Sequence, residues 1–138
     1  MDKKSFSLSA SFPYSADLVF NALTQARRIA VWSGQYGKIQ PIIGGRMELF
    51  DGWVHGIVLA YEQGKRLSFT WKPVEWDKEQ RATLVTCRFI SMRTGSQLRL
   101  RHSGFPNNSE LQHHREGWEE FVFNPLKAYL NSARYSKS

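Results

Sequence analysis

The stretch 110-ELQHHREGWEEFVFNPLKAYLNSAR-134 is the only long amphipathic helical pattern in the sequence. Apolar and aromatic side chains recur along it at the i, i+3, i+4, i+7 spacing that lines one face of an α-helix. They are Leu111, His114, Trp118, Phe121, Val122, Pro125, Tyr129 and Leu130. Such a helix must bury this face against a partner surface, which the preceding part of the chain has to provide.

Pro125 interrupts this helical pattern. A proline inside a helix has no N–H to donate, and its ring pushes against the carbonyl group four residues back, here that of Phe121. The sequence therefore predicts a bend between Phe121 and Pro125.

The chain before residue 110 shows mainly the alternating apolar and polar pattern of β-strands. The predicted strands are 5–12, 46–50, 53–61, 66–71, 82–90 and 96–102, and two short helices, 16–23 and 26–32, follow the first strand. Asp51-Gly52 is a strong signal for a tight turn between the second and third strands. Together these elements predict an α+β fold in which an antiparallel sheet grips one long C-terminal helix.

The last two predicted strands form a hairpin whose register follows from the loop at residues 92–95. The predicted cross-strand pairs are Cys87 with Leu100, Val85 with His102, and Arg88 with Arg99. Because like charges directly across a ladder are mildly unfavourable, the face that carries Arg88, Arg99 and Arg101 should point away from the helix. This basic strip is a candidate surface for a weakly bound acidic partner.

Length and composition limit the classes of protein that this chain can be. With 138 residues, 41% of them hydrophobic, it is long enough for a single domain with its own core. No apolar run approaches the roughly 20 residues that cross a bilayer, and residues 1–9 lack the apolar segment of a signal peptide, so a cytoplasmic protein is expected.

The single cysteine and the scattered histidines have no metal-ligand spacing, so no metal site is predicted. The net charge of +7 fits either an acidic partner or a basic surface that only keeps the protein soluble. The basic residues are dispersed along the chain rather than clustered, which argues against specific nucleic-acid binding.

Six short phrases together resemble a known family: 23-LTQARRIAVW-32, 44-GG-45, 56-GIVL-59, 66-RLSFTW-71, 102-HSGF-105 and 117-GW-118. In this order, over nearly the whole chain, they resemble the START-like (SRPBCC) helix-grip superfamily. Within it they are most similar to the Aha-type domains, homologues of the activator of the heat-shock-protein-ninety ATPase. The resemblance implies a curved sheet wrapped round the C-terminal helix, with an apolar cavity between them for a lipid-like or polycyclic, polyketide-like molecule. It implies no catalytic motif and no cofactor.

The candidate ligand-binding residues are the large side chains expected between sheet and helix. They are Trp32, Trp53, His55, Phe69, Trp71, Cys87, Leu100, His102, Phe105, Trp118, Phe121, Val122 and Tyr129. So many aromatic rings round one helix are hard to close-pack without a gap, although a plain core is the alternative. His102, beside Val85 on the inner face, could orient a ligand or act as a general base, or its ring could be satisfied by a backbone group. Cys87 has no basic neighbour on its face, which favours an inert buried thiol.

Three functional classes follow from these residues. The first is a small-molecule binding module with an apolar cavity. The second is a cyclase-like or hydrolase-like enzyme that uses His102 or His55 with a helix carboxylate such as Glu119. The third is a co-chaperone-like interaction protein that presents the basic strip to an acidic partner. The sequence does not decide whether a reaction is catalysed, and it leaves a homodimer open.

Overall fold

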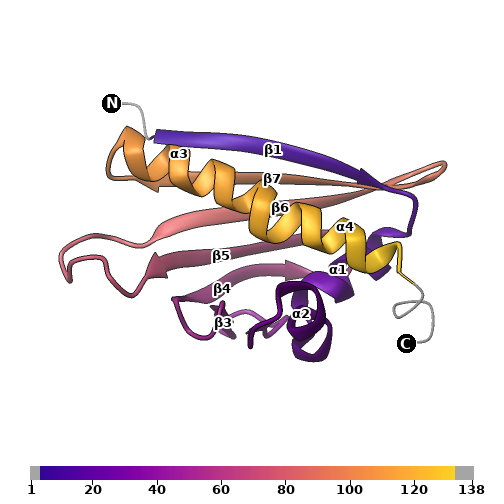
Figure 1. Ribbon diagram of the computed structural model, residues 1–138, viewed down its shortest axis with the longest axis horizontal. Coiled ribbons are helices and arrows are strands. Elements are labelled where there is room, and N and C mark those ends of the chain that lie inside the picture. The colour runs from indigo at the N-terminus through magenta and orange to yellow at the C-terminus, as the bar shows by residue number, and fades with distance from the viewer. Residues whose placement is uncertain (1–3, 133–138) are drawn as a thin grey trace.

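Seven antiparallel strands form one sheet, and a long C-terminal helical segment lies across one of its faces (Figure 1). The structure is a computed structural model that describes residues 4–132. Its elements are β1 (Lys4–Phe12), α1 (Ala16–Thr24), α2 (Ala26–Ser33), β2 (Lys38–Ile39), β3 (Arg46–Leu49), β4 (Val54–Glu62), β5 (Arg66–Pro73), β6 (Thr83–Met92), β7 (Gly95–Phe105), α3 (Asn108–Gly117), η1 (Trp118–Phe123) and α4 (Asn124–Leu130). The strand order is β1-β7-β6-β5-β4-β3-β2. The predicted α+β helix-grip fold is confirmed. Within residues 4–132, no helix has both the length and the apolar character to cross a membrane.

The strand pairing agrees closely with the alternation in the sequence. Each predicted strand is present, and the register of the β6–β7 hairpin is confirmed, since Cys87 pairs with Leu100 and Arg88 with Arg99. The hairpin loop is shorter than predicted, because Met92 already pairs with Gly95. The two-residue strand β2 was not predicted, since it is too short to show a period.

The predicted tight turn at Asp51-Gly52 is wrong in its length. The last pair of the β3–β4 ladder joins Leu49 to Val54, so the loop contains residues 50–53. Phe50, Asp51 and Gly52 all have positive φ angles, at 56°, 57° and 84°. Two of these residues are not glycine, and left-handed backbone costs such residues about 1 kcal/mol or more. The surrounding contacts have to hold this loop in place.

Irregularities in the ladders bend the sheet round the helix. The β4–β5 register shifts between Val58 and Ala60, and the β1–β7 register shifts between Lys4 and Ser5. Such bulges increase local twist and bend the strand. Gly56, two residues before Val58, permits a close approach of β4 to β5, because a Cβ atom there would lie 1.7 Å from the Thr70 carbonyl oxygen.

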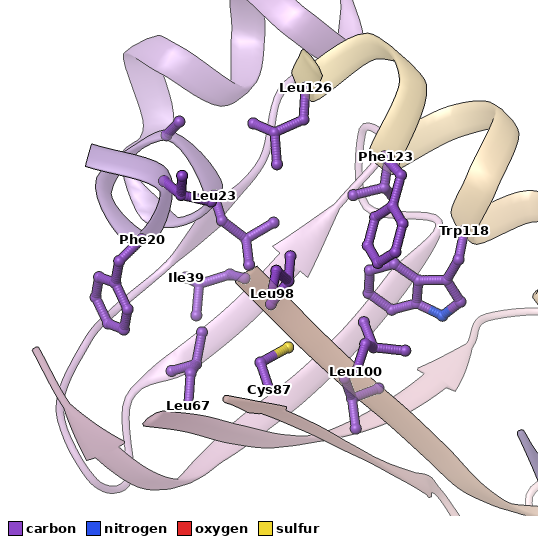
Figure 2. Packing of buried hydrophobic residues seen from close by; sticks show 14 of the residues in the cluster. Phe20, Leu23, Ile39, Leu67, Cys87, Leu98, Leu100, Trp118, Phe123 and Leu126 are labelled. Carbon is purple, nitrogen blue, oxygen red and sulfur yellow. The ribbon is translucent and has the colours of Figure 1, made fainter. Parts of the chain in front are cut away.

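The core fills the space between the sheet and the helices. Alternate residues of β6 and β7 point inward, as the parity of the hairpin predicts. Figure 2 shows Trp118 and Phe123 pointing from the C-terminal helix toward Leu98 and Leu100 of β7. The thiol of Cys87 lies in this core, and burial raises its pKa to about 12. The thiol is therefore protonated at neutral pH, as expected for an inert cysteine.

The C-terminal helix contains a π-helical turn, Trp118–Phe123, in the stretch where the sequence predicts a bend. Asn124 N–H bonds to Glu119 O, five residues back, and Pro125 follows in a backbone that stays helical through Phe123 and Asn124. The proline therefore removes an N–H inside a continuous helix, directly after the π-turn. Each residue of a π-turn rotates by less than the roughly 100° of an α-helix. Phe121 is consequently 55% exposed, whereas Phe123 is buried. The prediction that Phe121 faces the sheet is wrong for this reason.

Helices α1 and α2 cover only one end of the interface between the helix and the sheet. Both contact α4, and α1 also contacts β6 and β7. In Figure 1 they lie beside α4, whereas α3 lies toward the opposite end of the sheet, near the β5–β6 loop. The α3 end is therefore covered by loops rather than by further helices.

Candidate functional site

A pocket of about 440 Å³ opens at the α3 end of the interface. Its walls come from the helix, from the end of β5 and from the loops on either side of them. The lining residues are Gln35, Phe50, Trp53, Trp71, Glu75, Glu110, His113, His114, Gly117, Trp118, Phe121 and Val122. The walls are mainly aromatic, with Glu75 and His113 exposed and Glu110 partly buried among the lining residues. A volume of this size is within the usual range for small-molecule sites, about 300–1,000 Å³.

The strained β3–β4 loop forms one wall of this pocket. Tyr36 N–H donates to Asp51 Oδ1 at 2.7 Å, and Asp51 N–H donates to Tyr36 O at 2.9 Å. This pair of bonds fixes the loop to the segment after α2. It places Phe50 and Trp53 over the pocket, with their rings 6.2 Å apart between centroids. Residues held in unfavourable backbone regions are concentrated at binding sites, which supports this assignment.

His102 is buried behind the pocket in a fully bonded chain of groups. Trp118 Nε1–H donates to His102 Nδ1 at 3.0 Å, so the ring proton is on Nε2. His102 Nε2–H then donates to Thr83 Oγ1 at 2.7 Å, and the Thr83 hydroxyl donates to Trp71 O at 2.8 Å. Burial, with a smaller effect of His114, lowers the pKa of His102 to about 2. With both ring nitrogens bonded and no free lone pair, His102 is placed to hold Trp118 rather than to accept a proton.

His114 lies in the wall of the pocket among aromatic rings. Its ring stacks on Trp53 with 6.1 Å between centroids, and it meets Phe105 at 4.9 Å and Trp71 at 5.9 Å. Its Nδ1–H donates to Glu110 O at 2.9 Å. Burial lowers the pKa of His114, outweighing the opposing effect of that bond and of the Glu110 charge. The ring is therefore neutral near pH 7, and its approach to the Glu110 carboxylate at 3.6 Å is not an ion pair.

The predicted site residues separate into three groups in the structure. Trp53, Trp71, Trp118, Phe121 and Val122 line the pocket. Trp32, Phe69, Cys87, Leu100, His102, Phe105 and Tyr129 are buried in the packed core instead. His55 lies on the outer face of β4, where its side chain is exposed. The core group points inward as predicted, but it lies where neighbouring side chains close the space.

Several of these core residues have structural contacts that account for their burial. Trp32 Nε1–H donates to Ala22 O at 2.8 Å and joins the two short helices. The Tyr129 hydroxyl accepts from Arg28 at 3.0 Å. Phe69 is fully buried in the middle of β5.

Some of the residues that line the pocket are not among the predicted site residues. These are Gln35, Phe50, Glu75, Glu110, His113, His114 and Gly117. His114 could have been predicted as a site residue, since it belongs to the apolar helix face. Phe50 gave a weaker indication, since it precedes Asp51-Gly52. Gln35 and Glu75 lie in irregular segments, whose position no periodicity could indicate.

The acid–base pairs considered for an enzyme do not come together. Glu119 is exposed and does not line the pocket, His102 is fully bonded, and His55 is on the opposite face of the sheet. Among residues 4–132, no group of three or more His, Cys, Asp or Glu side chains is placed to hold a metal ion.

The basic strip is exposed on the outer face of the sheet. Arg66, Arg88 and Arg99 lie in one row across β5, β6 and β7, because Arg66 pairs with Arg88 and Arg88 with Arg99. Arg101 is exposed on the same strand as Arg99 and donates to Ser5 Oγ at 3.2 Å. The predicted outward orientation of Arg88, Arg99 and Arg101 is confirmed, and Arg66 extends the strip.

Comparison with known proteins gives matches in family and in fold. The family model described as "Activator of Hsp90 ATPase homolog 1-like protein" matches residues 13–131. An HSP90 activator from Plasmodium falciparum is 25% identical over 91% of this chain and 95% of its own, with a TM-score of 0.82. A protein from Mesorhizobium loti is 25% identical over 93% of this chain and 97% of its own, with a TM-score of 0.79. A protein in the dynemicin biosynthetic locus is 25% identical over 93% of this chain and 47% of its own, with a TM-score of 0.76. No curated protein gives a significant match.

Proposed function

Because the chain belongs to the family of Activator of Hsp90 ATPase homolog 1-like proteins, whose fold joins a curved sheet to one long helix, we propose that its pocket binds a hydrophobic small molecule. The observation that carries this proposal is the pocket of about 440 Å³ between α3, η1 and the β3–β4 loop. Three tryptophans line it, namely Trp53, Trp71 and Trp118. The size and the flat aromatic walls suit a polycyclic ligand better than a long flexible chain.

Binding to this pocket can be tested with N-phenyl-1-naphthylamine, a neutral probe whose fluorescence rises in apolar surroundings. We expect saturable binding with one site per chain. Trp53→Ala should weaken it at least tenfold, because the substitution removes one wall of the pocket. Ile43→Ala is the matched control, since Ile43 is 72% exposed and does not line the pocket. Absence of saturable binding, or equal loss in both variants, would contradict the proposal.

A second candidate function concerns the basic strip rather than the pocket. The row Arg66, Arg88 and Arg99 places like charges side by side, at a cost in stability that an acidic protein partner would relieve. A relative from Plasmodium falciparum is described as an HSP90 activator. We therefore infer that an Hsp90-type chaperone is the partner to test for this chain.

The measurement is the ATPase rate of Hsp90 from the same organism with and without this protein. Stimulation should fall with added salt, because surface charges are screened. Arg88→Glu should remove it, whereas Arg93→Glu, in the exposed β6–β7 loop, should keep it. An unchanged ATPase rate with the native protein would exclude this partner.

A further inference from the structure

Two buried polar atoms, on residues that line the pocket, have no hydrogen-bonding partner. They are Trp71 Nε1 and His114 Nε2, on side chains whose residues are 3% and 7% exposed. Among the residues that the structure describes, they are the only buried side-chain nitrogen or oxygen atoms without a partner. Leaving such an atom unpaired costs about 1–3 kcal/mol. That both belong to residues lining one pocket indicates a ligand group that completes them.

The chemical role of each atom follows from its surroundings. The indole Nε1–H of Trp71 can only donate. His114 Nδ1 bonds to the Glu110 carbonyl oxygen, which can only accept, so the ring proton is on Nδ1. His114 Nε2 therefore presents a lone pair and can only accept. These two residues thus supply one unpaired donor and one unpaired acceptor.

The two rings are held by packing in a fixed mutual position. Their centroids are 5.9 Å apart and their planes are inclined by 74°. The two rings are therefore direct neighbours. Contacts with Trp53, Trp76 and Phe105 hold the His114 ring in place. Reorienting it toward another partner would disrupt these contacts.

We propose that the ligand is a flat aromatic molecule bearing a neutral hydroxyl group, which accepts a hydrogen bond from Trp71 Nε1–H and donates one to His114 Nε2. This inference rests on the proposed ligand-binding function of the same pocket. A hydroxyl group both donates and accepts, whereas an ether or a carboxylate only accepts and would leave His114 unpaired.

The charges round the pocket favour the neutral form of that hydroxyl. Glu75 and Glu110 are among the lining residues, and no lysine or arginine is. An anionic group would therefore have no opposite charge in the wall. Phenolic hydroxyl groups, like that of tyrosine, are protonated at pH 7 and meet this requirement.

The test compares three probes of similar shape by isothermal titration: 2-naphthol, 2-methoxynaphthalene and naphthalene. The methoxy compound keeps the oxygen but cannot donate. We expect 2-naphthol to bind at least tenfold more tightly than either of the others, since a site built for a hydroxyl rejects analogues that leave its polar atoms unpaired. Equal affinity of all three would overturn this inference and leave the hydrophobic pocket in place.

Two substitutions assign the preference to the two atoms. Trp71→Phe removes the donor, and His114→Phe removes the acceptor while keeping an aromatic ring. Each should reduce the preference for 2-naphthol over naphthalene to less than threefold. A preference that survives in both folded variants would overturn the assignment.

A measurement on the native protein covers the case in which a variant does not fold. The ¹⁵N shift of His114 Nε2 should move toward the hydrogen-bonded value with 2-naphthol and not with 2-methoxynaphthalene. If neither compound moves it, the inference fails. If N-phenyl-1-naphthylamine binds while 2-naphthol does not, only this inference fails; if neither binds, the proposed function fails with it.

Discussion

The two ends of the C-terminal helix pack differently against the same sheet: the α4 end is filled, and the α3 end leaves a pocket. At the α4 end, Leu126, Tyr129 and Leu130 are buried against α1 and α2, and the space is filled. At the α3 end, His114 and Trp118 are also buried, yet a pocket remains beside them. The difference lies in what covers each end. Two short helices pack closely against α4 at one end, whereas loops cover the other end and leave a gap.

The π-turn at Trp118–Phe123 lies where one end gives way to the other. It rotates Phe121 outward to the edge of the pocket and Phe123 inward to the core. Single π-turns inside α-helices are frequently found at functional sites. The turn therefore lets one helix pack tightly at one end and carry a pocket at the other.

The largest effect that would distinguish the two ends is expected from Leu126→Ala. Leu126 is fully buried, so its truncation removes apolar contacts and leaves a cavity. This should lower the unfolding free energy by about 2–5 kcal/mol. Chemical denaturation would measure the loss. Binding of N-phenyl-1-naphthylamine should persist in the folded fraction, because Leu126 does not line the pocket. A loss below about 1 kcal/mol would show that the α4 end is not the tightly packed one.

The next effect concerns pH and sharpens the comparison at the α3 end. The pKa of His102 is lowered to about 2, against about 6.5 in the unfolded chain. Below pH 6.5 the unfolded state binds a proton that the folded state does not, so stability falls as the pH falls from 6.5 toward 2. From this residue we expect the unfolding free energy to be about 2 kcal/mol lower at pH 5 than at pH 7.

The matched variants for this pH effect are His102→Gln and His55→Gln. Glutamine can accept from Trp118 and donate to Thr83, but it does not titrate. His102→Gln should therefore reduce the dependence between pH 5 and pH 7 and leave the part that comes from His114, whose pKa is also lowered by burial. His55→Gln, at an exposed position, should keep the full dependence. An unchanged dependence in His102→Gln would mean that His102 is not the group responsible.

The sequence predicted what depends on parity and missed what depends on local geometry. Alternation and loop length were enough to pair Cys87 with Leu100 and to turn Arg88 outward. No periodicity reveals three successive left-handed residues at Phe50, Asp51 and Gly52, or the extra residue of a π-turn. These two features position the walls of the pocket. The aromatic residues of the site could thus be identified by type, but not divided between core and pocket.

A smaller effect on stability is expected at Phe121, the residue that the π-turn exposes. Because Phe121 is 55% exposed, Phe121→Ala should change the unfolding free energy by less than about 1 kcal/mol. It should still weaken binding of N-phenyl-1-naphthylamine, since the ring lines the pocket. Fluorescence titration of the variant would measure its binding, and chemical denaturation would measure its unfolding free energy. A large loss of stability with unchanged binding would contradict the division of the helix into two ends.

The smallest change is expected from Pro125→Ala. The helix already accommodates the missing N–H of Pro125 directly after the π-turn, so alanine should alter the unfolding free energy by less than about 1 kcal/mol. The π-turn should also remain. Replacing it with an α-turn would advance α4 by one residue and rotate Leu126 and Leu130 by about 100° away from the core.

Deletion of the exposed residue Glu120 is the counterpart of Pro125→Ala. It removes the extra residue itself, so a continuous α-helix could form with Leu126 still facing the core. The pocket should then change shape, because Phe121 would lie about 200° from the buried Trp118 round the helix, on the face away from the pocket. Crystal structures of both variants are the measurement. If Pro125→Ala alone converts the turn into regular α-helix, the proline rather than the packing of α4 maintains the π-turn, and the two ends of the helix are less independent than the native structure indicates.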